Sequence, residues 1–247
     1  MLEAKAEIES KHPNTKVQVY SASVTSRADI DRVLAATGSI DILMLNAGHM
    51  HPPGPAINIS AKDLATDFEI NVLGPMNLIN TFAASPSRGE RTIIHTSSAG
   101  AYMERPGLAG YNASKLAMSQ LIRMIAVENQ GKEGTDRSLR AFSFHPAIAY
   151  TPMAKNVMGL KEDSFQYDDS KSLQSQTCCP TRRPEYLADS VSDNLPAHFA
   201  VWLSSPEADF LHGRFLWAHW DVEEIMTAKA QIESDPNALK VVLNVGV

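Results

Sequence analysis

A tyrosine and a lysine stand four residues apart in the stretch SSAGAYMERPGLAGYNASK, residues 97–115, and together they could act as a general acid/base. Tyr111 and Lys115 share one face of any helix that contains them, because side chains four apart are neighbours. A free phenol, with a pKa of about 10, is a poor base at neutral pH, but a nearby ammonium lowers that pKa. The alternative is an aromatic residue at a helix start beside a solvated lysine.

Two further polar residues could complete such a site. Ser98 follows an apolar run and precedes Tyr111 by thirteen residues, so its hydroxyl could bind a substrate oxygen and stabilise charge there. Asn71 lies inside an expected helix, where asparagine is a mediocre helix former, and could hold a water that relays protons to the lysine. Each has an ordinary alternative, which is a loop serine or an asparagine that bonds a neighbouring backbone group.

Strands and helices in alternation must position these residues, and they predict an α/β fold with a doubly wound parallel sheet. The continuous apolar run 41–48 predicts a strand buried on both faces, and Gly74-Pro75 predicts a helix kink. Ser26 is a candidate helix cap, with Gly38 just past the helix end. We expect strands at 16–22, 41–48, 91–98, 140–147 and 213–220, and helices at 2–11, 26–38, 60–84, 113–130 and 195–205.

Ligands of such sheets bind beyond the carboxyl ends of the strands. Three expected strands end in polar or small residues, at 46–48, 96–98 and 145–147. The sequence therefore predicts a small-molecule site at this edge of the sheet.

Composition excludes several classes of protein. A length of 247 residues, 44% of them hydrophobic and 20% charged, predicts one domain over 1–247. The net charge of -6 gives no footprint for nucleic acid, and no apolar run approaches the ~20 residues of a membrane span. The charged start MLEAKAEIES is not a secretory signal, and the adjacent Cys178 and Cys179 predict neither a disulfide framework nor a zinc site. We predict a cytoplasmic protein with no metal, nucleic-acid partner or membrane partner.

In order and spacing, these residues resemble the short-chain dehydrogenase/reductase family from residue 2 to about residue 222. Residues 46–48, Asn-Ala-Gly, are similar to the motif after the family's fourth strand, and 146–151, PAIAYT, to its Pro-Gly-x-x-x-Thr segment beside the nicotinamide. Residues 200–222, AVWLSSPEADFLHGRFLWAHWDV, further resemble members from filamentous fungi. The positions that match the family's catalytic tetrad are Asn71, Ser98, Tyr111 and Lys115.

The resemblance implies hydride transfer between NAD or NADP and a carbonyl or alcohol, with substrates drawn from secondary metabolism. It implies that Tyr111 passes the proton, that Ser98 holds the oxygen and that Lys115 lowers the tyrosine pKa and binds the nicotinamide ribose. Asn71 would support a proton relay through water. The family also implies a homodimer or higher oligomer, formed through the helices at 60–84 and 113–130. The implied cofactor-binding residues are Ser23, Val24, Asn46, Ala47, Gly48, Tyr111, Lys115, Ala149 and Thr151.

The N-terminal region departs from the family pattern. The family begins with a strand, a glycine-rich loop, a helix and a second strand, whereas residues 2–11 match the next helix and no glycine precedes Gly38. We therefore expect a Rossmann-like fold truncated at its N-terminus by about two strands and a helix, with weak dinucleotide binding. Residues 23–25, Ser-Val-Thr, stand where the family has Asp-Val-Thr, and Ala147 stands where it has glycine.

Without those two strands, the strand at 16–22 is separated from 41–48 by about 10 Å of sheet. Three outcomes follow: the strand moves in beside 41–48, a partner chain fills the gap, or the chain alone is an unstable fragment.

Other interpretations remain open. The same tetrad could run acid/base chemistry without hydride, as a dehydratase, isomerase or cyclase, or the chain could be a non-catalytic dimer partner of a full-length relative. His49 and His51, which follow the Asn-Ala-Gly motif, either line the site or only shape a loop. Residues 153–190 match the family's substrate loop and lid.

Overall fold

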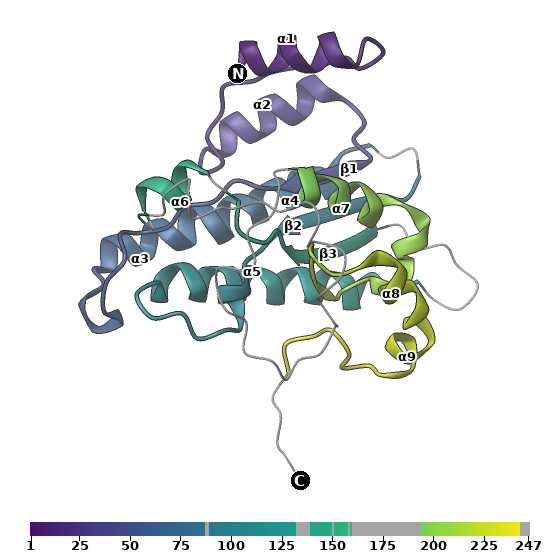
Figure 1. The fold of residues 1–247 in the computed structure, drawn as a ribbon. Helices are drawn as coiled ribbons and strands as arrows, with labels where there is room; N and C mark the ends of the chain where they lie inside the picture. The colour runs from purple at the N-terminus through teal and green to yellow at the C-terminus, as the bar shows by residue number, and fades with distance from the viewer. Residues whose placement is uncertain (87–88, 132–138, 150, 158, 160–193, 243–247) are drawn as a thin grey trace.

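Four parallel strands form the central sheet of the computed structural model, which describes residues 1–86, 89–131, 139–149, 151–157, 159 and 194–242 (Figure 1). Leu45 pairs with His95, and His145 with Trp217, so the carboxyl ends of neighbouring strands meet at one edge. The predicted parallel sheet is confirmed. In their order across the sheet, the strands are β1 (Ile42–Leu45), β2 (Arg91–Thr96), β3 (Leu139–His145) and β4 (Phe215–Trp217).

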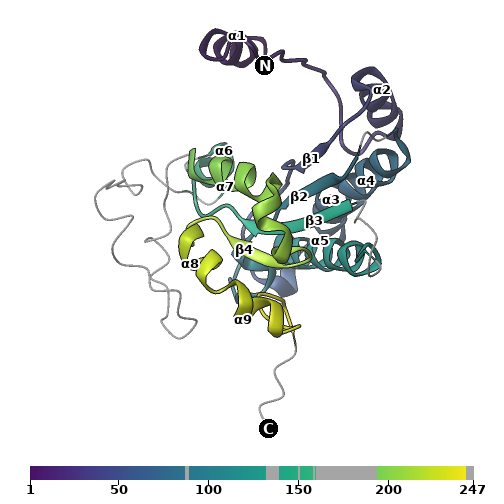
Figure 2. The same ribbon diagram turned by 90° about the vertical axis from the view of Figure 1, so that its right-hand side faces the viewer.

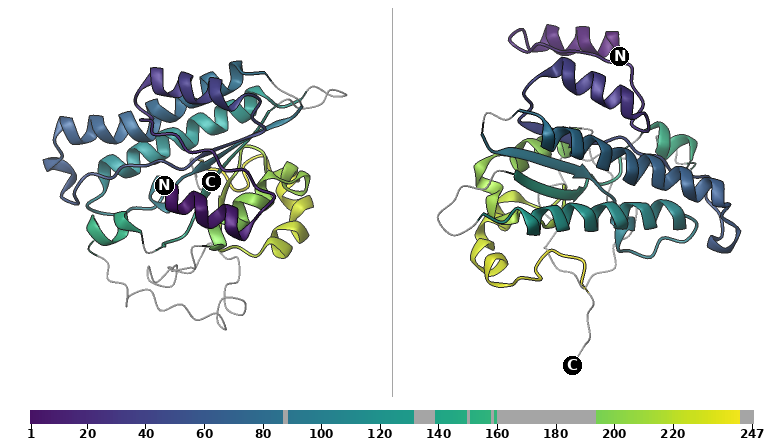
Figure 3. Two further views of the ribbon diagram at one scale, coloured as in Figure 1. Left: turned by 90° about the horizontal axis from the view of Figure 1, so that it is seen from above. Right: turned by 180° about the vertical axis from the view of Figure 1, so that it is seen from behind.

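Helices cover both faces of this sheet. On one face α4 (Gly74–Ala84) and α5 (Ala109–Glu128) lie side by side across the strands, and α3 (Ala61–Phe68) leads into α4 (Figure 3). Phe82 and Met118 lie in the apolar core of this face, and Phe142 and Leu203 in the core of the other. The other face is covered by α7 (Asn194–Ser204), the 3-10 helix η5 (Pro206–Leu211), α8 (Val222–Thr227) and α9 (Lys229–Ser234).

Capping residues begin two of the predicted helices. The Ser26 side chain accepts a hydrogen bond from the Asp29 amide and begins α2 (Arg27–Thr37), and Ser60 does the same for Asp63 in α3. These bonds satisfy amides that the first turn of a helix leaves unpaired. Because α5 begins at Ala109, four residues before the expected start, Tyr111 lies in its first turn.

The long helical segment expected at 60–84 contains a π-helical turn, Glu69–Leu73, directly before Gly74-Pro75. Such turns are most frequent at functional sites, and this one holds Asn71. Gly74 is needed for close packing, because a Cβ there would lie 2.8 Å from the carbonyl oxygen of Val24. The turn at 23–25 therefore packs against the start of α4.

Residues 16–22 form no strand, so that prediction is wrong. Val17 instead accepts a hydrogen bond from Lys5 and donates one to Glu9, both in α1 (Leu2–Lys11). No residue of α1 is buried, and α1 lies apart from the sheet (Figures 1 and 2). A strand needs a neighbouring strand for its backbone hydrogen bonds, and within the described residues β1 pairs with β2 alone. The first of the three expected outcomes, in which 16–22 moves in beside β1, is thereby excluded.

The strand β1 is buried on one face only, whereas its apolar run predicts burial on both. Leu43 and Leu45 lie in the core with α4, but Ile42 is 48% exposed and Met44 is 41% exposed. The reason is that α7 packs against β2 and leaves the second face of β1 uncovered. The edge of the sheet at β1 therefore presents apolar side chains.

Two further regions were not readable from the sequence. The region 153–190 begins within α6 (Pro152–Asn156), and the rest, including Cys178 and Cys179, lies almost entirely outside the described residues. The helices α8 and α9 have six residues each, which is too short for a clear periodicity. Within the described residues, every helix is too short or too polar to span a bilayer.

Candidate active site

The carboxyl edge of the sheet brings together Ser98, Tyr111 and Lys115. Ser98 follows β2 and caps the 3-10 helix η3 (Ala99–Ala101), where its hydroxyl accepts a hydrogen bond from the Gly100 amide at 3.2 Å. Tyr111 and Lys115 lie in the first two turns of α5, and the Ser98 side chain is near enough to the phenol to act to lower its pKa. All three side chains are buried. The structure therefore gathers the residues that the sequence singled out, and their catalytic role stays a prediction.

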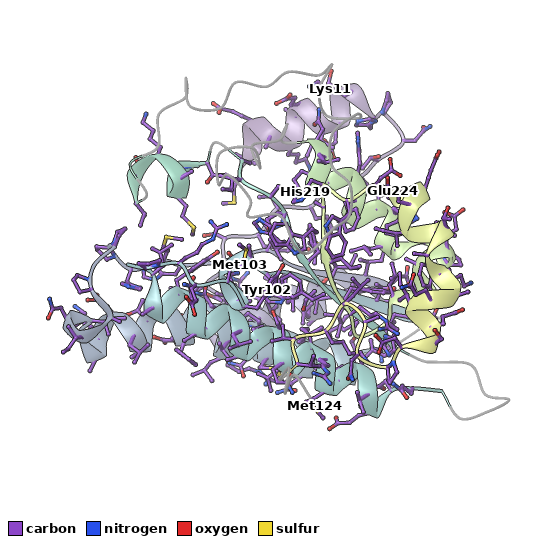
Figure 4. All side chains as sticks on the ribbon, turned by 60° about the horizontal axis from the view of Figure 1, so that its bottom comes forward. Lys11, Tyr102, Met103, Met124, His219 and Glu224 are labelled. Atoms are coloured by element: carbon purple, nitrogen blue, oxygen red, sulfur yellow. The ribbon has the colours of Figure 1, made fainter. Side chains whose placement is uncertain are left out.

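The loop between η3 and α5 contributes Leu108, which is buried beside Tyr111. Tyr102 and Met103, labelled in Figure 4, follow η3 directly. Further along, the Gly54 amide donates a hydrogen bond to the Gly107 carbonyl at 3.0 Å. This bond joins the loop after β1 to the loop before α5, so both loops border the site.

Lys115 is buried, and its ammonium donates a hydrogen bond to the Thr96 carbonyl at 2.9 Å. Its Nζ lies 5.8 Å from the centre of the Tyr111 ring. Burial lowers the pKa of Lys115 from 10.5 to about 8, because the charged form loses its hydration. The lysine therefore carries its charge less firmly than a solvated lysine does.

Burial raises the pKa of Tyr111, whereas the sequence predicts a lowered one. The Ser98 hydrogen bond and the charge of Arg105 act to lower this pKa, and the charge of Asp67 raises it further. Desolvation of the phenol is the largest cause of this shift and Lys115 is not among the causes, so the expected lowering of the Tyr111 pKa by Lys115 stays a prediction. In this arrangement Tyr111 holds its proton more tightly than a free tyrosine does.

Both N–H donors of the Asn71 side chain and one lone pair of its oxygen are used by protein groups. Its Oδ1 accepts from the His49 amide at 2.7 Å, and its Nδ2 donates to the His49 carbonyl and to Ser114 Oγ, each at 2.8 Å. Ser114 Oγ in turn donates to the Tyr111 carbonyl at 2.7 Å. Asn71 thereby ties the loop after β1 to α5. Its Oδ1 keeps a second lone pair, so the water relay stays a prediction.

Sequence reasoning missed Asp67, which lies fully buried in α3 and binds both His49 and His51. The signal was its spacing, since Asp67 precedes Asn71 by four residues and thus shares a helix face with it. We expected His49 and His51 either to line the site or only to shape a loop. The structure shows that both side chains bind the Asp67 carboxylate. Within the described residues, no three His, Cys, Asp or Glu side chains gather as metal ligands.

The expected cofactor residues of the N-terminal half come from the turn at 23–25 and from the end of β1. Residues 46–48 are exposed at the end of β1, and a Cβ on Gly48 would lie 3.5 Å from Lys115 Nζ and 3.6 Å from Asn71 Oδ1. Val24 packs against Gly74, three positions after Asn71. Ser23 instead bonds Thr25 and Asp29 beside it, so the structure brings Gly48 to Lys115 and Val24 to the start of α4.

The segment 146–151 continues from β3. Ala147 has a φ of 66°, in the left-handed region that favours glycine, which is the residue the family has here. The Ala149 carbonyl accepts from the Thr151 amide at 2.9 Å, and the Thr151 side chain caps α6. Met153 of α6 packs against the cluster that contains Tyr111, while Tyr150 lies outside the described residues.

The groups at this edge fit the nicotinamide end of a dinucleotide. An ammonium has three N–H donors, and the hydrogen bond to Thr96 uses one, so Lys115 can also donate to ribose hydroxyls beside Gly48. For the pyrophosphate end of the dinucleotide, the described residues offer no glycine-rich loop ahead of β1 that could bind it.

Comparison with known proteins connects this geometry to a family. A family model for the short chain dehydrogenases matches residues 1–160. The short chain dehydrogenase/reductase AacuD of Aspergillus aculeatus is 37% identical, over 96% of this chain and 73% of its own length. A short chain dehydrogenase/reductase of Claviceps purpurea is 35% identical, over 97% of this chain and 72% of its own length. These two relatives are fungal.

Solved structures share the fold. A 7α-hydroxysteroid dehydrogenase complexed with NADH and 7-oxo glycochenodeoxycholic acid gives a TM-score of 0.63 at 23% identity, over 87% of this chain and 78% of that chain. A mutant short-chain dehydrogenase/reductase of Serratia marcescens gives a TM-score of 0.66 at 20% identity, over 88% and 82%. At these low sequence identities, the solved structures show only that this chain shares their fold. The family model and the two fungal relatives show to which family the chain belongs. This chain therefore belongs to the short-chain dehydrogenase/reductase family of oxidoreductases.

Proposed function

We propose that this chain interconverts a carbonyl and an alcohol with NAD or NADP, and that Ser98, Tyr111 and Lys115 form its site. The observation that supports the proposal is the meeting of a phenol, a hydroxyl and a buried amine where β2 and α5 adjoin. Membership of an oxidoreductase family agrees with it.

In the proposed reaction, Tyr111 exchanges a proton with the substrate oxygen. Because burial raises its pKa, the phenol is protonated at neutral pH and can donate to a carbonyl oxygen that gains negative charge. Ser98 donates a hydrogen bond to the same oxygen, so two donors meet the developing charge. A reduced nicotinamide, when bound, supplies the hydride.

The cofactor-binding residues keep their expected roles in the proposal. Lys115 holds the nicotinamide ribose beside Gly48, and Asn71 positions the loop and α5 that border it. The remaining contacts are proposed for Ser23, Val24, Asn46, Ala47, Tyr111, Ala149 and Thr151.

The surroundings of Tyr111 favour an apolar substrate. Met50 and Leu108 are buried against the tyrosine, and Met153 and Val157 pack on the same cluster. A small ketone or alcohol with an apolar body fits these neighbours better than a charged one, because burying an unpaired charge is costly. Substrates from fungal secondary metabolism belong to this proposal.

The proposal is tested by fluorescence titration of the full chain with NADPH and NADH, followed by a panel of aromatic and alicyclic ketones. We expect saturable but weak binding, with a Kd above about 1 μM and thus a binding free energy smaller than about 8 kcal/mol in magnitude, and consumption of the nucleotide with ketone. Lys115→Met should weaken binding, and Lys11→Met, on exposed α1, is the matched control. No binding of either nucleotide would contradict the proposal, and turnover without nucleotide would favour the acid/base alternative.

We also propose that the chain forms a homodimer through α4 and α5. Apolar side chains are exposed in and before these helices, namely Leu73, Leu116, Met124 and Val127, and Figure 4 shows Met124 projecting from α5 away from the sheet. We expect light scattering to give a dimer that Met124→Glu weakens, whereas Val201→Glu, at a more exposed site on α7, leaves it intact. A monomer at micromolar concentration would contradict this proposal.

A further inference from the structure

A small pocket, which we call the basic pocket, lies between α5 and the segment that follows α9. Gln120 and Arg123 of α5 line one side of it, and Lys240 and Val241 line the other. The segment after α9 returns to α5 here, and Arg123 Nη1 donates a hydrogen bond to the Val241 carbonyl at 3.0 Å (Figure 1). The pocket is narrow and opens to solvent, so it fits one small group and leaves the rest of a larger ligand outside.

Three cationic side chains meet at the basic pocket, because each of them holds a carbonyl of the segment after α9. Besides Arg123, Lys240 donates to the Pro236 carbonyl at 2.6 Å, and Arg214 donates to the Ala238 carbonyl. Arg123, Arg214 and Lys240 all line the pocket. Their acceptors are uncharged, so these hydrogen bonds gather three positive charges without neutralising them.

Carboxylates do not neutralise these cations at contact distance either. In the part of the chain that the structure describes, none of the three cations forms an ion pair. Burial lowers the pKa of Arg214, and the charges of Asp235 and Glu233 offset part of that shift. The Arg214 side chain is buried, and its Nε has no hydrogen-bond partner among the described residues. Leaving a buried donor unpaired is costly, so a bound acceptor is favoured beside it.

The charges of the basic pocket also act on one another. Burial lowers the pKa of Lys240, and the charges of Arg214 and Arg123 lower it further, while the charge of Asp235 acts in the opposite direction. A nearby like charge disfavours the charged form of a group, whereas an opposite charge favours it. An anion bound among the three cations would therefore relieve their repulsion.

The cations keep hydrogen-bond donors that a ligand can use. An ammonium has three N–H donors and a guanidinium has five, and Lys240 and Arg123 each use one of theirs for the carbonyls named above. Gln120, on the exposed face of α5, uses one amide hydrogen for a long contact with Met124 Sδ at 3.6 Å and keeps the other. Several donors and three positive charges around a narrow pocket suit an anion with several acceptor oxygens.

We propose that the basic pocket binds a phosphate group through Arg123, Lys240 and Arg214. The ligand is free phosphate or the phosphate monoester of a small molecule, whose remaining atoms stay in solvent. The proposal goes beyond the proposed function, because Ser98, Tyr111 and Lys115 do not line this pocket. The pocket adjoins the α5 face that we propose for the dimer, since Leu116 belongs to both.

The test is a phosphorus-31 NMR titration of the full chain with inorganic phosphate and, separately, with glycerol 3-phosphate, without nucleotide and at constant ionic strength. We expect each anion to bind saturably at one site, and sulfate to compete where chloride at the same ionic strength does not. Tighter binding of glycerol 3-phosphate would identify a phosphate monoester as the ligand, whereas equal or weaker binding would identify free phosphate.

Variants locate the binding in the basic pocket. Arg123→Gln and Lys240→Gln each remove one charge and should weaken binding by about tenfold or more. Lys62→Gln, which removes an exposed charge on α3, is the matched control and should leave the affinity unchanged. If the charge-removing variants do not fold, Gln120→Glu decides the matter, because it keeps every cation and adds a negative charge at the rim. Gln18→Glu, on the exposed N-terminal segment, is its control.

Two results would overturn the proposal. One is the absence of phosphate binding to the folded wild-type chain. The other is binding that keeps its affinity in folded Arg123→Gln, Lys240→Gln or Gln120→Glu, since the phosphate would then lie elsewhere. The titration needs neither nucleotide nor turnover, so its result does not depend on the proposed function.

Discussion

Residues 1–22 and residues 91–128 carry similar sequence patterns, yet they pack in opposite ways. Each contains a β-branched run and a helix with apolar residues. Residues 91–96 form β2 between two other strands, and α5 buries a stripe that runs from Gly110 to Ala126. Residues 16–22 form no strand, and α1 buries nothing.

The difference shows that a pattern gives a segment the capacity to pack, while its neighbours decide whether it does. A strand needs a partner for its hydrogen bonds, and an apolar helix face needs a surface to cover. The pKa values of Tyr111 and Lys115 also depend on packing, because desolvation by burial is the largest cause of both shifts.

The largest contrast is expected in activity. Tyr111→Phe removes the proposed proton donor and should lower kcat/KM for ketone reduction by about 100-fold to 10,000-fold. Tyr20→Phe makes the same chemical change in the N-terminal region, where the hydroxyl donates a hydrogen bond to Gln18 at 2.9 Å, and should have no effect. Steady-state kinetics on both variants measures the contrast, and equal rates would show that the buried site is not the catalytic one.

Stability should separate the two regions next. Phe82 is fully buried in the core with α5, so Phe82→Ala should lower the free energy of unfolding by about 3–5 kcal/mol. Ile8→Ala in α1 removes a side chain that is already exposed and should cost less than about 0.5 kcal/mol. Denaturant unfolding of both variants gives the comparison, which fails if Ile8→Ala costs as much as Phe82→Ala.

The pH dependence of stability should reveal the buried lysine. The folded chain binds fewer protons at Lys115 than the unfolded chain between pH 8 and 10.5, because the pKa falls from 10.5 to about 8 on folding. Stability should therefore rise with pH in this window, by about 2 kcal/mol from pH 8 to about pH 9.5. The rise should be absent in Lys115→Met and present in Lys11→Met. A flat profile in the wild-type chain would show that Lys115 is solvated.

The smallest effects are expected from two backbone positions with positive φ. Ala147 has a φ of 66°, so Ala147→Gly should relieve strain and stabilise the chain by about 0.5–1 kcal/mol. Gly38 has a φ of 76° and open space around it, so Gly38→Ala should destabilise by about 1 kcal/mol through strain alone. Thermal unfolding of both variants checks the opposite signs. Two changes of the same sign would contradict this account.

Much of the fold was predictable because its signals are local. The Ser26 cap and Gly38 mark the two ends of α2, and the alternation of apolar runs with helices gives the parallel sheet. The ordered spacing of Ser98, Tyr111 and Lys115 predicted that they would meet, and the structure brings them together. The one-sided burial of β1 was not predictable, because it depends on where α7 packs.

The sequence by itself determined which side chains are present and which can share a helix face, including Tyr111 with Lys115 and Asp67 with Asn71. Only the tertiary structure decided that Asp67 lies buried between two histidines under Gly110, and that desolvation by burial is the largest cause of the shift in the Tyr111 pKa. The physical reason is that helix faces and caps depend on neighbours along the chain. Desolvation and charge proximity depend instead on segments that only folding brings together.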